Sequence, residues 1–337
     1  MSDKQYDVLT FGRSSIDLYS QNIGADFIDI KGFDAFVGGS PLNIAVACSR
    51  LGLTAALLSG VGDDKVGDFI INFLKNEKVI TSSVRQIKGK RSSAVILGIE
   101  PPDKFPLVYH RENAADSHVN IDDVIQAKIP EFRLLEISGT ALNVEPGRSA
   151  AFFAAETAVD SDIPVVFDLD FRADQWHDPR AFGIMVRAIL PKVEIAIGTE
   201  EEVLAATLTD ISRITITDQQ ISGPEIQGNL EDAINKILKT GIKALIVKKG
   251  SKGARIYMQH EYINDVPGFP VDVVNVLGAG DAFAGGFIYG YLKGWDLYKS
   301  CRMGNACGAL VVQQSGCANF MPGLDEALAF IEERGGF

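Results

Sequence analysis

Cysteine is scarce in this chain. There are four cysteines in 337 residues (Cys48, Cys301, Cys307 and Cys317), and no two of them are spaced as Cys-x-x-Cys. This number and spacing exclude a dense disulfide framework and argue against a zinc site built from cysteine pairs. We expect all four to be reduced thiols that pack as small apolar side chains.

Positive charge and long apolar runs are also scarce. The 32 lysines and arginines are outnumbered by 44 acidic residues, which gives a formal net charge of -12. Nucleic acids and anionic membranes require a basic surface, so we expect neither as a partner. Residues 1–7 are polar and acidic, and no later run is long enough to span a bilayer. We therefore expect a cytoplasmic protein that meets anionic ligands only at a local site.

Short apolar runs alternate with longer helical patterns along most of the chain. The runs are typical of buried parallel strands: Asp7–Phe11, Ala55–Ser59, Leu134–Ser138, Val165–Leu169, Val193–Ile197 and Ala244–Val247. The helical patterns lie at Ser40–Leu51, Gly67–Glu77, Glu145–Val159, Pro179–Leu190, Glu200–Ala206 and Leu230–Lys239, and the chain after Asp281 is mostly helical. Repeated βα units predict an α/β fold with a doubly wound, mostly parallel sheet.

Two early stretches depart from this alternation. Residues 22–37 and 91–111 resemble strands with no helix inside them, and they could pair as a separate small sheet. No linker or repeat divides the chain. We therefore expect one domain over residues 1–337, with a β lid formed by about 13–37 and 91–113 inserted in it.

The sequence Gly278-Ala279-Gly280-Asp281 stands just before a helical pattern of small residues. Glycines let successive backbone N–H groups at a helix N-terminus point at one anion. The charge of Asp281 would repel a phosphate, so its presence there suggests that it has a proton to remove. The motif predicts phosphoryl transfer to a hydroxyl; the alternative is an aspartate that only favours the helix dipole.

A second group of polar and small residues lies near the N-terminus. Asp17 follows the first strand, at the edge where open α/β sheets bind ligands, and Gly38, Gly39 and Asn43 surround a helix start. A carboxylate and an amide suit the paired hydroxyls of a polyol, because one accepts and the other both donates and accepts. The alternatives are a turn-forming aspartate, a glycine hinge and an asparagine that only faces the helix.

Together, Gly38-Gly39-x-x-x-Asn43 and Gly278-Ala279-Gly280-Asp281 resemble the motifs of the ribokinase (PfkB) family of carbohydrate kinases, and the resemblance spans essentially the whole chain. It implies a ribokinase-like fold. It also implies that Asp281 is the base that deprotonates the substrate hydroxyl, and that the N–H groups of residues 278–280 neutralise the transferred phosphoryl group. Asp17, Gly38, Gly39 and Asn43 would hold the sugar.

The same resemblance implies an ATP site. Lys248, Gly250 and Gly253 match the strand and turn that border the nucleotide, and Asn305 matches a position near the adenine. The alternative for Lys248 is a solvated charge at a strand end.

Phosphoryl transfer requires Mg²⁺ on the phosphate oxygens. Residues 199–202 resemble the family's Asn-x-x-Glu motif, with Thr199 in place of the asparagine. We expect Glu202 to reach the metal through water, with Glu201 as the second choice; the alternative is an acidic first turn of a helix. Asn275-Val276 replaces the family's usual Asp-Thr, so K⁺ remains an open candidate cofactor.

Substrate choice is expected to depend on Tyr109 and Arg111 in the lid and on Arg172 after a central strand. Arginine offers a fixed fork of donors for a carboxylate, so sugar acids are favoured over neutral sugars. The alternatives are ion pairs of Arg111 with Glu112 or Asp116, and of Arg172 with Asp168 or Asp170.

Several of these segments resemble the branch of the family that phosphorylates 5-dehydro-2-deoxy-D-gluconate in inositol breakdown. The resemblance implies transfer from ATP to the 6-hydroxyl, and a homodimer formed through the lid. One alternative is a 2-dehydro-3-deoxygluconate kinase, and another is a non-catalytic sugar-acid sensor of the same fold. A dinucleotide-dependent dehydrogenase is excluded because no Gly-x-Gly-x-x-Gly follows the first strand.

Overall fold

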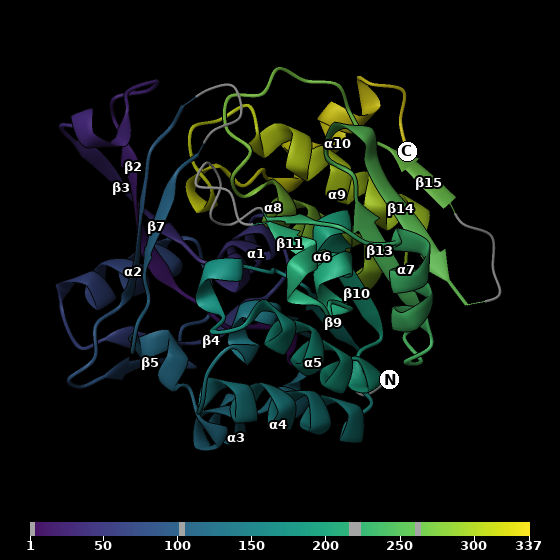
Figure 1. Ribbon diagram of the computed structural model, residues 1–337, viewed down its shortest axis with the longest axis horizontal. Coiled ribbons are helices and arrows are strands. Elements are labelled where there is room, and N and C mark those ends of the chain that lie inside the picture. Colours follow the sequence, from purple (N-terminus) through teal and green to yellow (C-terminus); the bar gives the residue numbers. More distant parts are fainter. Residues whose placement is uncertain (1–3, 101–104, 216–223, 260–263) are drawn as a thin grey trace.

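A nine-stranded sheet forms the centre of the molecule (Figure 1). The computed structural model describes residues 4–100, 105–215, 224–259 and 264–337, so residues 101–104 of the expected lid lie outside the described part. The strand order is β15-β14-β13-β10-β9-β8-β1-β4-β5. The strands are β1 (Tyr6–Phe11), β4 (Ala55–Gly62), β5 (Val84–Ile87), β8 (Phe132–Ser138), β9 (Val165–Asp168), β10 (Ile195–Thr199), β13 (Ala244–Lys248), β14 (Gly253–Met258) and β15 (Asn264–Pro267). Only β13 with β14 and β14 with β15 pair antiparallel in it, which confirms the doubly wound, mostly parallel sheet.

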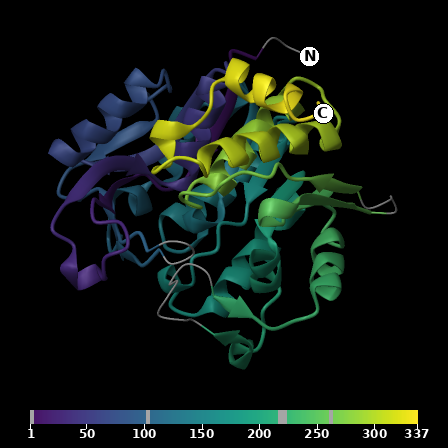
Figure 2. The ribbon, with the colours of Figure 1, turned by 90° about the horizontal axis from the view of Figure 1, so that it is seen from above.

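Helices cover both faces of this sheet, as Figure 2 shows from above. Alternate strand residues enter opposite cores because side chains of a strand point to opposite faces: Val8 packs in one core and Leu9 in the other. The first core contains residues of α1 (Ser40–Arg50), α2 (Lys65–Asn76), α8 (Ala279–Leu292), α9 (Leu297–Val311) and α10 (Leu324–Glu332). The second contains residues of α3 (Ile121–Ala127), α4 (Gly147–Asp160), α5 (Pro179–Ile189), α6 (Glu200–Ala206) and α7 (Leu230–Leu238).

Helix α8 is buried on nearly every side, which explains its small residues. It packs between α1 and α9. A Cβ on Gly285 would overlap Ala47 of α1, and one on Gly286 would lie 2.8 Å from the carbonyl oxygen of Met303 in α9. The glycines therefore let α8 approach both neighbours closely enough to hold its N-terminus at the edge of the sheet.

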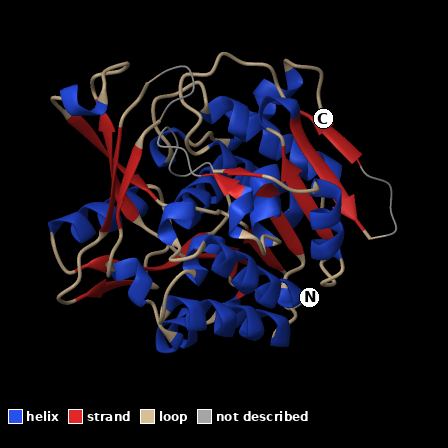
Figure 3. Cartoon of the chain, in the orientation of Figure 1, coloured by secondary structure: helices blue, strands red, loops and turns tan. Residues whose placement is uncertain are grey.

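A separate four-stranded sheet, called the small sheet below, stands to one side of the large one (Figure 3). Its order is β3 (Phe33–Gly38), β2 (Ser15–Ser20), β6 (Ser93–Leu97) and β7 (Leu107–His110). The expected strand over 22–37 is partly wrong, because only its last residues form β3, and Phe27–Asp29 is a 3₁₀ turn. The strand β2 was not predicted from the sequence, because its pattern is the reverse of that of a core strand. Its buried face carries Ser15, Asp17 and Tyr19, whereas Ile16 and Leu18 are only half-buried.

Four short elements had no signal in the sequence. Helix α3 is 7 residues long. The edge strand β15 has 4 mostly exposed residues, and β11 (Ile214–Thr215) and β12 (Glu225–Ile226) have 2 residues each. Such short or polar segments lack the periodicity by which helices and strands are recognised.

The four cysteines are free and buried, as expected. Among the described residues, the helices are too short or too polar for any of them to cross a bilayer.

Candidate active site

Charged side chains meet at the carboxyl ends of the central strands. Val166 of β9 and Ile246 of β13 pack in the core beneath α1 and α8. Asp168 and Lys248 follow two residues later and so point to the same face. The Lys248 ammonium lies 3.4 Å from both carboxylate oxygens of Asp168. A buried ion pair thus stands at the sheet edge where ligands bind in open α/β folds.

Helix α8 begins beside this pair. Gly278 precedes it with φ of 81°, in the left-handed region that favours glycine. The first N–H groups of a helix have no intrahelical partner and carry the positive end of its dipole. A Cβ on Gly280 would lie 3.1 Å from the Lys248 ammonium. The glycine motif and Lys248 are therefore brought together as an arrangement that fits a phosphate.

Asp281 lies in the first turn of α8 and is held by two residues of α1. Its Oδ1 accepts a hydrogen bond of 2.7 Å from the Ser40 hydroxyl, and its Oδ2 accepts one of 2.6 Å from the Asn43 side-chain amide. Burial raises the pKa of Asp281, the charge of Asp170 adds to this, and the two hydrogen bonds oppose it. A fixed carboxylate with increased proton affinity is suited to act as a general base.

Asn43 keeps one functional atom free. Its Oδ1 is buried and has no hydrogen-bond partner among the described residues, whereas its Nδ2 is bound to Asp281. A sugar hydroxyl that donates to this oxygen would lie next to the base.

A buried hydrogen-bonded chain extends from Asp281 into the sheet. Ser138 of β8 lies 3.5 Å from the Ser40 hydroxyl and 3.0 Å from Oε1 of Glu136. The other oxygen of Glu136 is buried without a partner among the described residues. Burial, with a contribution from the charge of Asp168, raises the pKa of Glu136 well above its usual value. Glu136 was not among the residues predicted from the sequence, although a single acidic residue inside an apolar strand was a visible signal.

The group predicted to hold the sugar lies between the small sheet and α1. Asp17 of β2 is buried and accepts a 2.7 Å hydrogen bond from Ser15, and burial raises the pKa of its carboxyl. A Cβ on Gly38 would overlap the Asp17 carboxylate. Gly39 has φ of 108°, and a Cβ there would overlap the carbonyl of Arg13. Both glycines are thus required by the close approach of the backbone around Asp17.

The predicted arginines form ion pairs that the sequence analysis named as alternatives. Arg172 lies 2.9 Å from Asp170, and its side chain remains 30% exposed. Arg111 is buried, lies 2.7 Å from Asp116, and donates a 2.7 Å hydrogen bond to Gln175. Their contact with a substrate stays a prediction.

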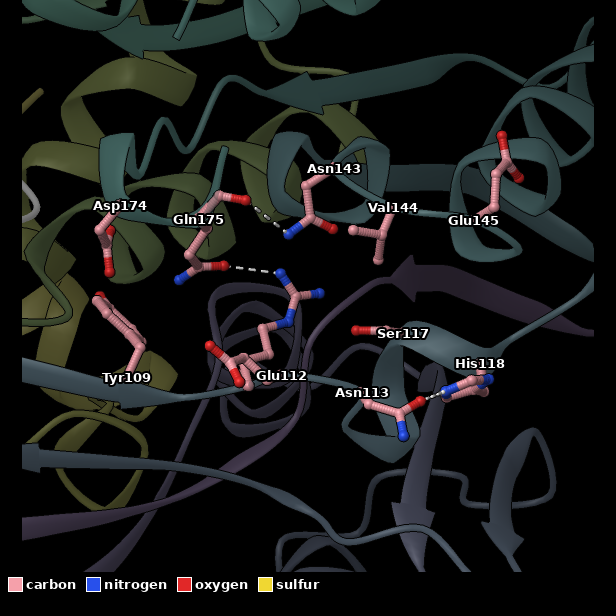
Figure 4. A pocket seen from close by; sticks show the side chains of 11 residues that line it. Tyr109, Glu112, Asn113, Ser117, His118, Asn143, Val144, Glu145, Asp174 and Gln175 are labelled. Atoms are coloured by element: carbon pink, nitrogen blue, oxygen red, sulfur yellow. Dashed lines mark hydrogen bonds between the residues drawn. The ribbon is translucent and has the colours of Figure 1, made fainter. Parts of the chain in front are cut away.

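A cavity of about 400 Å³ adjoins Arg111 and Tyr109 (Figure 4). Asn143 and Gln175, which follow β8 and β9, line it opposite the small sheet. Its volume lies within the range of small-molecule sites. All of the lining residues except Val144 carry a polar group on their side chains, so the space suits the polar end of a ligand.

The predicted nucleotide residues lie at the β13 edge of the sheet. Gly250 and Gly253 have φ of 57° and 94° and form the turn between β13 and β14. Asn305 of α9 donates hydrogen bonds of 3.2 and 3.0 Å to the carbonyls of Val266 and Pro267. Asn305 thus anchors β15 to α9, and its contact with adenine stays a prediction.

Glu202 is part of the N-terminal cap of α6. Its Oε2 accepts a 2.7 Å hydrogen bond from the Thr199 backbone, and its own N–H donates to the Thr199 hydroxyl at 3.2 Å. The Lys248 ammonium lies 3.9 Å from the same carboxylate. Glu201 is exposed. Of the two glutamates predicted to reach the metal, Glu202 is thus the one that lies close to the ion pair of Lys248 and Asp168.

The carboxylates do not form a metal cage by themselves. Within the described ranges, no group of three or more His, Cys, Asp or Glu residues could hold a metal ion. Mg²⁺ usually retains several waters and binds through one or two carboxylates together with substrate phosphates. Asp168 and Glu202, which lie 3.4 and 3.9 Å from the Lys248 ammonium, fit that mode of binding.

Known proteins resemble this chain over almost its whole length. The family model for pfkB family carbohydrate kinases matches residues 5–324. The 5-dehydro-2-deoxygluconokinases of Clostridium tetani and Geobacillus thermodenitrificans are 31% and 32% identical over 332 residues, which is 98% of this chain and 94% of each relative. Among solved structures, a fructokinase double mutant from Vibrio cholerae in a form with fructose, ADP and potassium bound is 25% identical, with a TM-score of 0.80 over 98% of this chain and 99% of that chain. An uncharacterized sugar kinase from Pyrococcus horikoshii in complex with ATP is 26% identical, with a TM-score of 0.79 over 97% and 99%. The chain therefore belongs to the pfkB family of ATP-dependent carbohydrate kinases.

Proposed function

We propose that this kinase transfers the γ-phosphoryl group of ATP to the 6-hydroxyl of 5-dehydro-2-deoxy-D-gluconate. The observation that carries the proposal is the position of Asp281, which is held by Ser40 and Asn43 at the N-terminus of α8 and next to Lys248. The choice of sugar acid is supported by relatives of about 30% identity that bear the name 5-dehydro-2-deoxygluconokinase.

The reaction uses Asp281 as the base. The substrate hydroxyl gives its proton to the Asp281 carboxylate as its oxygen forms a bond to the γ-phosphorus, and the bond from that phosphorus to the β,γ-bridging oxygen breaks to release ADP. The N–H groups of Gly278, Ala279 and Gly280, together with Lys248, stabilise the negative charge of the transferred group. Mg²⁺, reached from Glu202 through water, would neutralise the phosphate oxygens.

The sugar lies between the small sheet and α1. Asp17 accepts hydrogen bonds from its hydroxyls, and the free Oδ1 of Asn43 accepts another beside the reacting group. Gly38 and Gly39 allow the backbone to approach it. Tyr109, Arg111 and Arg172 bind the end of the molecule that carries the carboxylate.

ATP lies along the β13 edge of the large sheet. Gly250 and Gly253 border it, and Asn305 lies near the adenine. Closure of the small sheet over the sugar excludes water and limits hydrolysis of ATP.

The deciding experiment compares ADP release with Mg²⁺-ATP and four substrates: 5-dehydro-2-deoxygluconate, 2-dehydro-3-deoxygluconate, fructose and ribose. We expect fast turnover on the first alone. Preference for the second would assign the chain to the other sugar-acid kinase, and preference for a neutral sugar would refute the carboxylate hypothesis. Binding of a sugar acid without turnover would favour a sensor.

Asp281→Asn is the matched catalytic control. It should lower kcat by about 10²- to 10⁴-fold, the usual contribution of a general base, and leave ATP binding unchanged. The amide introduced by this substitution can still donate to Ser40, because a serine hydroxyl accepts as well as donates. Turnover close to that of the wild type would remove Asp281 from the mechanism.

We also propose a homodimer that forms through the small sheet. Exposed apolar side chains support this: Ile23 and Ile28 beside β2 and β3 are 63% and 91% exposed. Ile28→Asp should convert a dimer to a monomer in light scattering, whereas a wild-type monomer would refute the dimer. Activation by K⁺ is tested by exchanging K⁺ for Na⁺ in the turnover assay.

A further inference from the structure

Arg13 is a buried cation with few partners among the described residues. It lies between β1 and β2 and is only 7% exposed. Within the part of the chain that the structure describes, its side chain donates one hydrogen bond, from Nη1 to the Ser15 hydroxyl at 3.1 Å, and its buried Nε has no partner. Among the described residues, no carboxylate oxygen lies within 4.0 Å of its guanidinium. A guanidinium has five N–H donors, so most of its donors remain available to a ligand.

The surroundings of Arg13 are those of the sugar site. Its guanidinium carbon lies 5.3 Å from the centre of the Tyr109 ring, in the small sheet. Ser15, which accepts its hydrogen bond, donates in turn to Asp17. Asp17, Asp170 and Asp116 are the carboxylates whose charges act on it from a greater distance. Arg13 therefore lies between the carboxylate predicted to bind the sugar and the aromatic ring that flanks the cavity.

The other two arginines of the site are more fully engaged. The Arg111 Nε is paired with Asp116, and its Nη1 donates to both Gln175 and the Thr140 carbonyl. The Arg172 guanidinium is paired with Asp170. A new anion must compete with a carboxylate for each of them, whereas at Arg13 it meets no competitor. Burial of an unpaired cation is costly, and binding of an anion removes that cost.

We propose that Arg13 binds the substrate carboxylate and sets the preference of this kinase for sugar acids. The guanidinium lies over the Tyr109 ring, at 5.3 Å from its centre, and presents N–H donors as a fork to the two carboxylate oxygens. Ser15 accepts a hydrogen bond from Arg13 and donates one to Asp17, so it fixes the guanidinium relative to the Asp17 carboxylate. This inference rests on the proposed function, because it requires a sugar-acid substrate.

The test compares Arg13→Met and Arg13→Lys with the wild type on the sugar acid and on fructose. Arg13→Met keeps an apolar stem and removes the donors, so KM for the sugar acid should rise by about 10- to 100-fold. Its kcat/KM for fructose, a slow substrate of the wild type, should fall by a much smaller factor than that for the sugar acid, because no carboxylate contact is lost. Arg13→Lys keeps the positive charge but not the fork of donors, so its KM for the sugar acid should lie between those of the wild type and Arg13→Met. An equal loss on both substrates, or an unchanged KM for the sugar acid, overturns the proposal.

A binding measurement separates this inference from the proposed function. Gluconate, a stable sugar acid, should raise the Tm of the wild type and have no effect on Arg13→Met. Arg85→Met, which removes a surface arginine paired with Asp123, should respond like the wild type. If the wild type phosphorylates no sugar acid and gains no stability from gluconate, the proposed function fails by itself. If the wild type gains stability and Arg13→Met gains as much, only the assignment of Arg13 fails.

The stability of the unliganded variants excludes a merely structural role. Arg13→Met removes a buried charge that has no ion-pair partner in the described part of the chain, so its Tm without ligand should be no lower than that of the wild type. An arginine that served only to hold the small sheet against β1 would give a lower Tm in this variant.

Discussion

Replacement of Glu136 by Gln should stabilise the protein progressively as pH rises. Glu136 is 0% exposed in the middle of β8, where one oxygen accepts a hydrogen bond from Ser138 and the other has no partner among the residues that the structure describes. Such a site disfavours the charged form of the carboxyl, and burial raises its native pKa well above the usual value. Gln has nearly the same shape, still accepts the hydrogen bond from Ser138, and carries no titrating group.

The sign of the effect follows from proton binding. In the unfolded chain Glu136 ionises near pH 4.3, as an ordinary glutamate does, whereas the native protein keeps its proton to a higher pH. Between these two pKa values the native state binds one more proton, so each pH unit lowers the free energy of unfolding by about 1.4 kcal/mol. The variant does not have this loss. Its advantage should therefore grow by about 1.4 kcal/mol with each pH unit above about 4.3, and it should stop growing at the native pKa.

The assay is urea unfolding of both proteins at half-unit intervals from pH 4.5 to 8. Glu332→Gln, the same change at an exposed position of α10, is the control and should stay within about 0.5 kcal/mol of the wild type at every pH. A constant difference between Glu136→Gln and the wild type, or a loss of stability at neutral pH, would mean that native Glu136 is ionised. That result would refute the inference that Glu136 is protonated and neutral where it joins the hydrogen-bonded side chains that lead to Asp281.

Three further substitutions probe the site. Ser40→Ala removes one hydrogen bond that lowers the pKa of Asp281, so the acid limb of the pH profile of kcat/KM should move up by about one pH unit. An unmoved limb would show that Ser40 does not stabilise the ionised base. Lys248→Met should lower kcat/KM for ATP, measured with saturating sugar, by at least about 100-fold, because a positive charge beside the glycine motif is lost. A change below about threefold would mean that Lys248 only neutralises the charge of Asp168. Gly39→Ala should lower the free energy of unfolding by about 1–3 kcal/mol in urea, because φ of 108° is strained for alanine, and full stability would contradict this close packing.

The large sheet could be predicted from the sequence because its strands are short apolar runs flanked by amphipathic helices. Helix α6 matches its expected bounds of Glu200–Ala206, and α1 begins at Ser40 as expected. The small sheet was harder, since β2 buries Asp17 and leaves Ile16 half-buried. A strand whose polar face lines a ligand site has the reverse of the pattern that marks a core strand.

The candidate site was predictable where a motif is local and not where it depends on distant partners. Asp281 and its glycines are contiguous. By contrast, nothing adjacent to Glu136 indicates that Ser138 and Ser40 link it to Asp281. Arg13 could not be predicted from the sequence, because what distinguishes it from Arg111 and Arg172 is that no described carboxylate pairs with it. Only a structure shows which arginines are already in ion pairs.

The charged group at the sheet edge leads to a last prediction, that nucleotide binding takes up a proton. The Lys248 ammonium lies 3.4 Å from Asp168, and burial raises the pKa of Asp168 to about 7 while Lys248 opposes this rise. A phosphate at the N-terminus of α8 competes for Lys248 and brings negative charge close to Asp168.

Both effects raise the pKa of Asp168 further, so at pH 7 a fraction of the molecules must bind a proton when the nucleotide arrives. Calorimetric titration with a non-hydrolysable ATP analogue, in EDTA so that no metal competes for the carboxylates, should give a binding enthalpy that depends on the ionisation enthalpy of the buffer. Asp168→Asn should abolish that dependence. If the enthalpy is independent of the buffer in the wild type, the phosphate does not draw Lys248 away from Asp168, and the lysine would neutralise the carboxylate throughout the catalytic cycle.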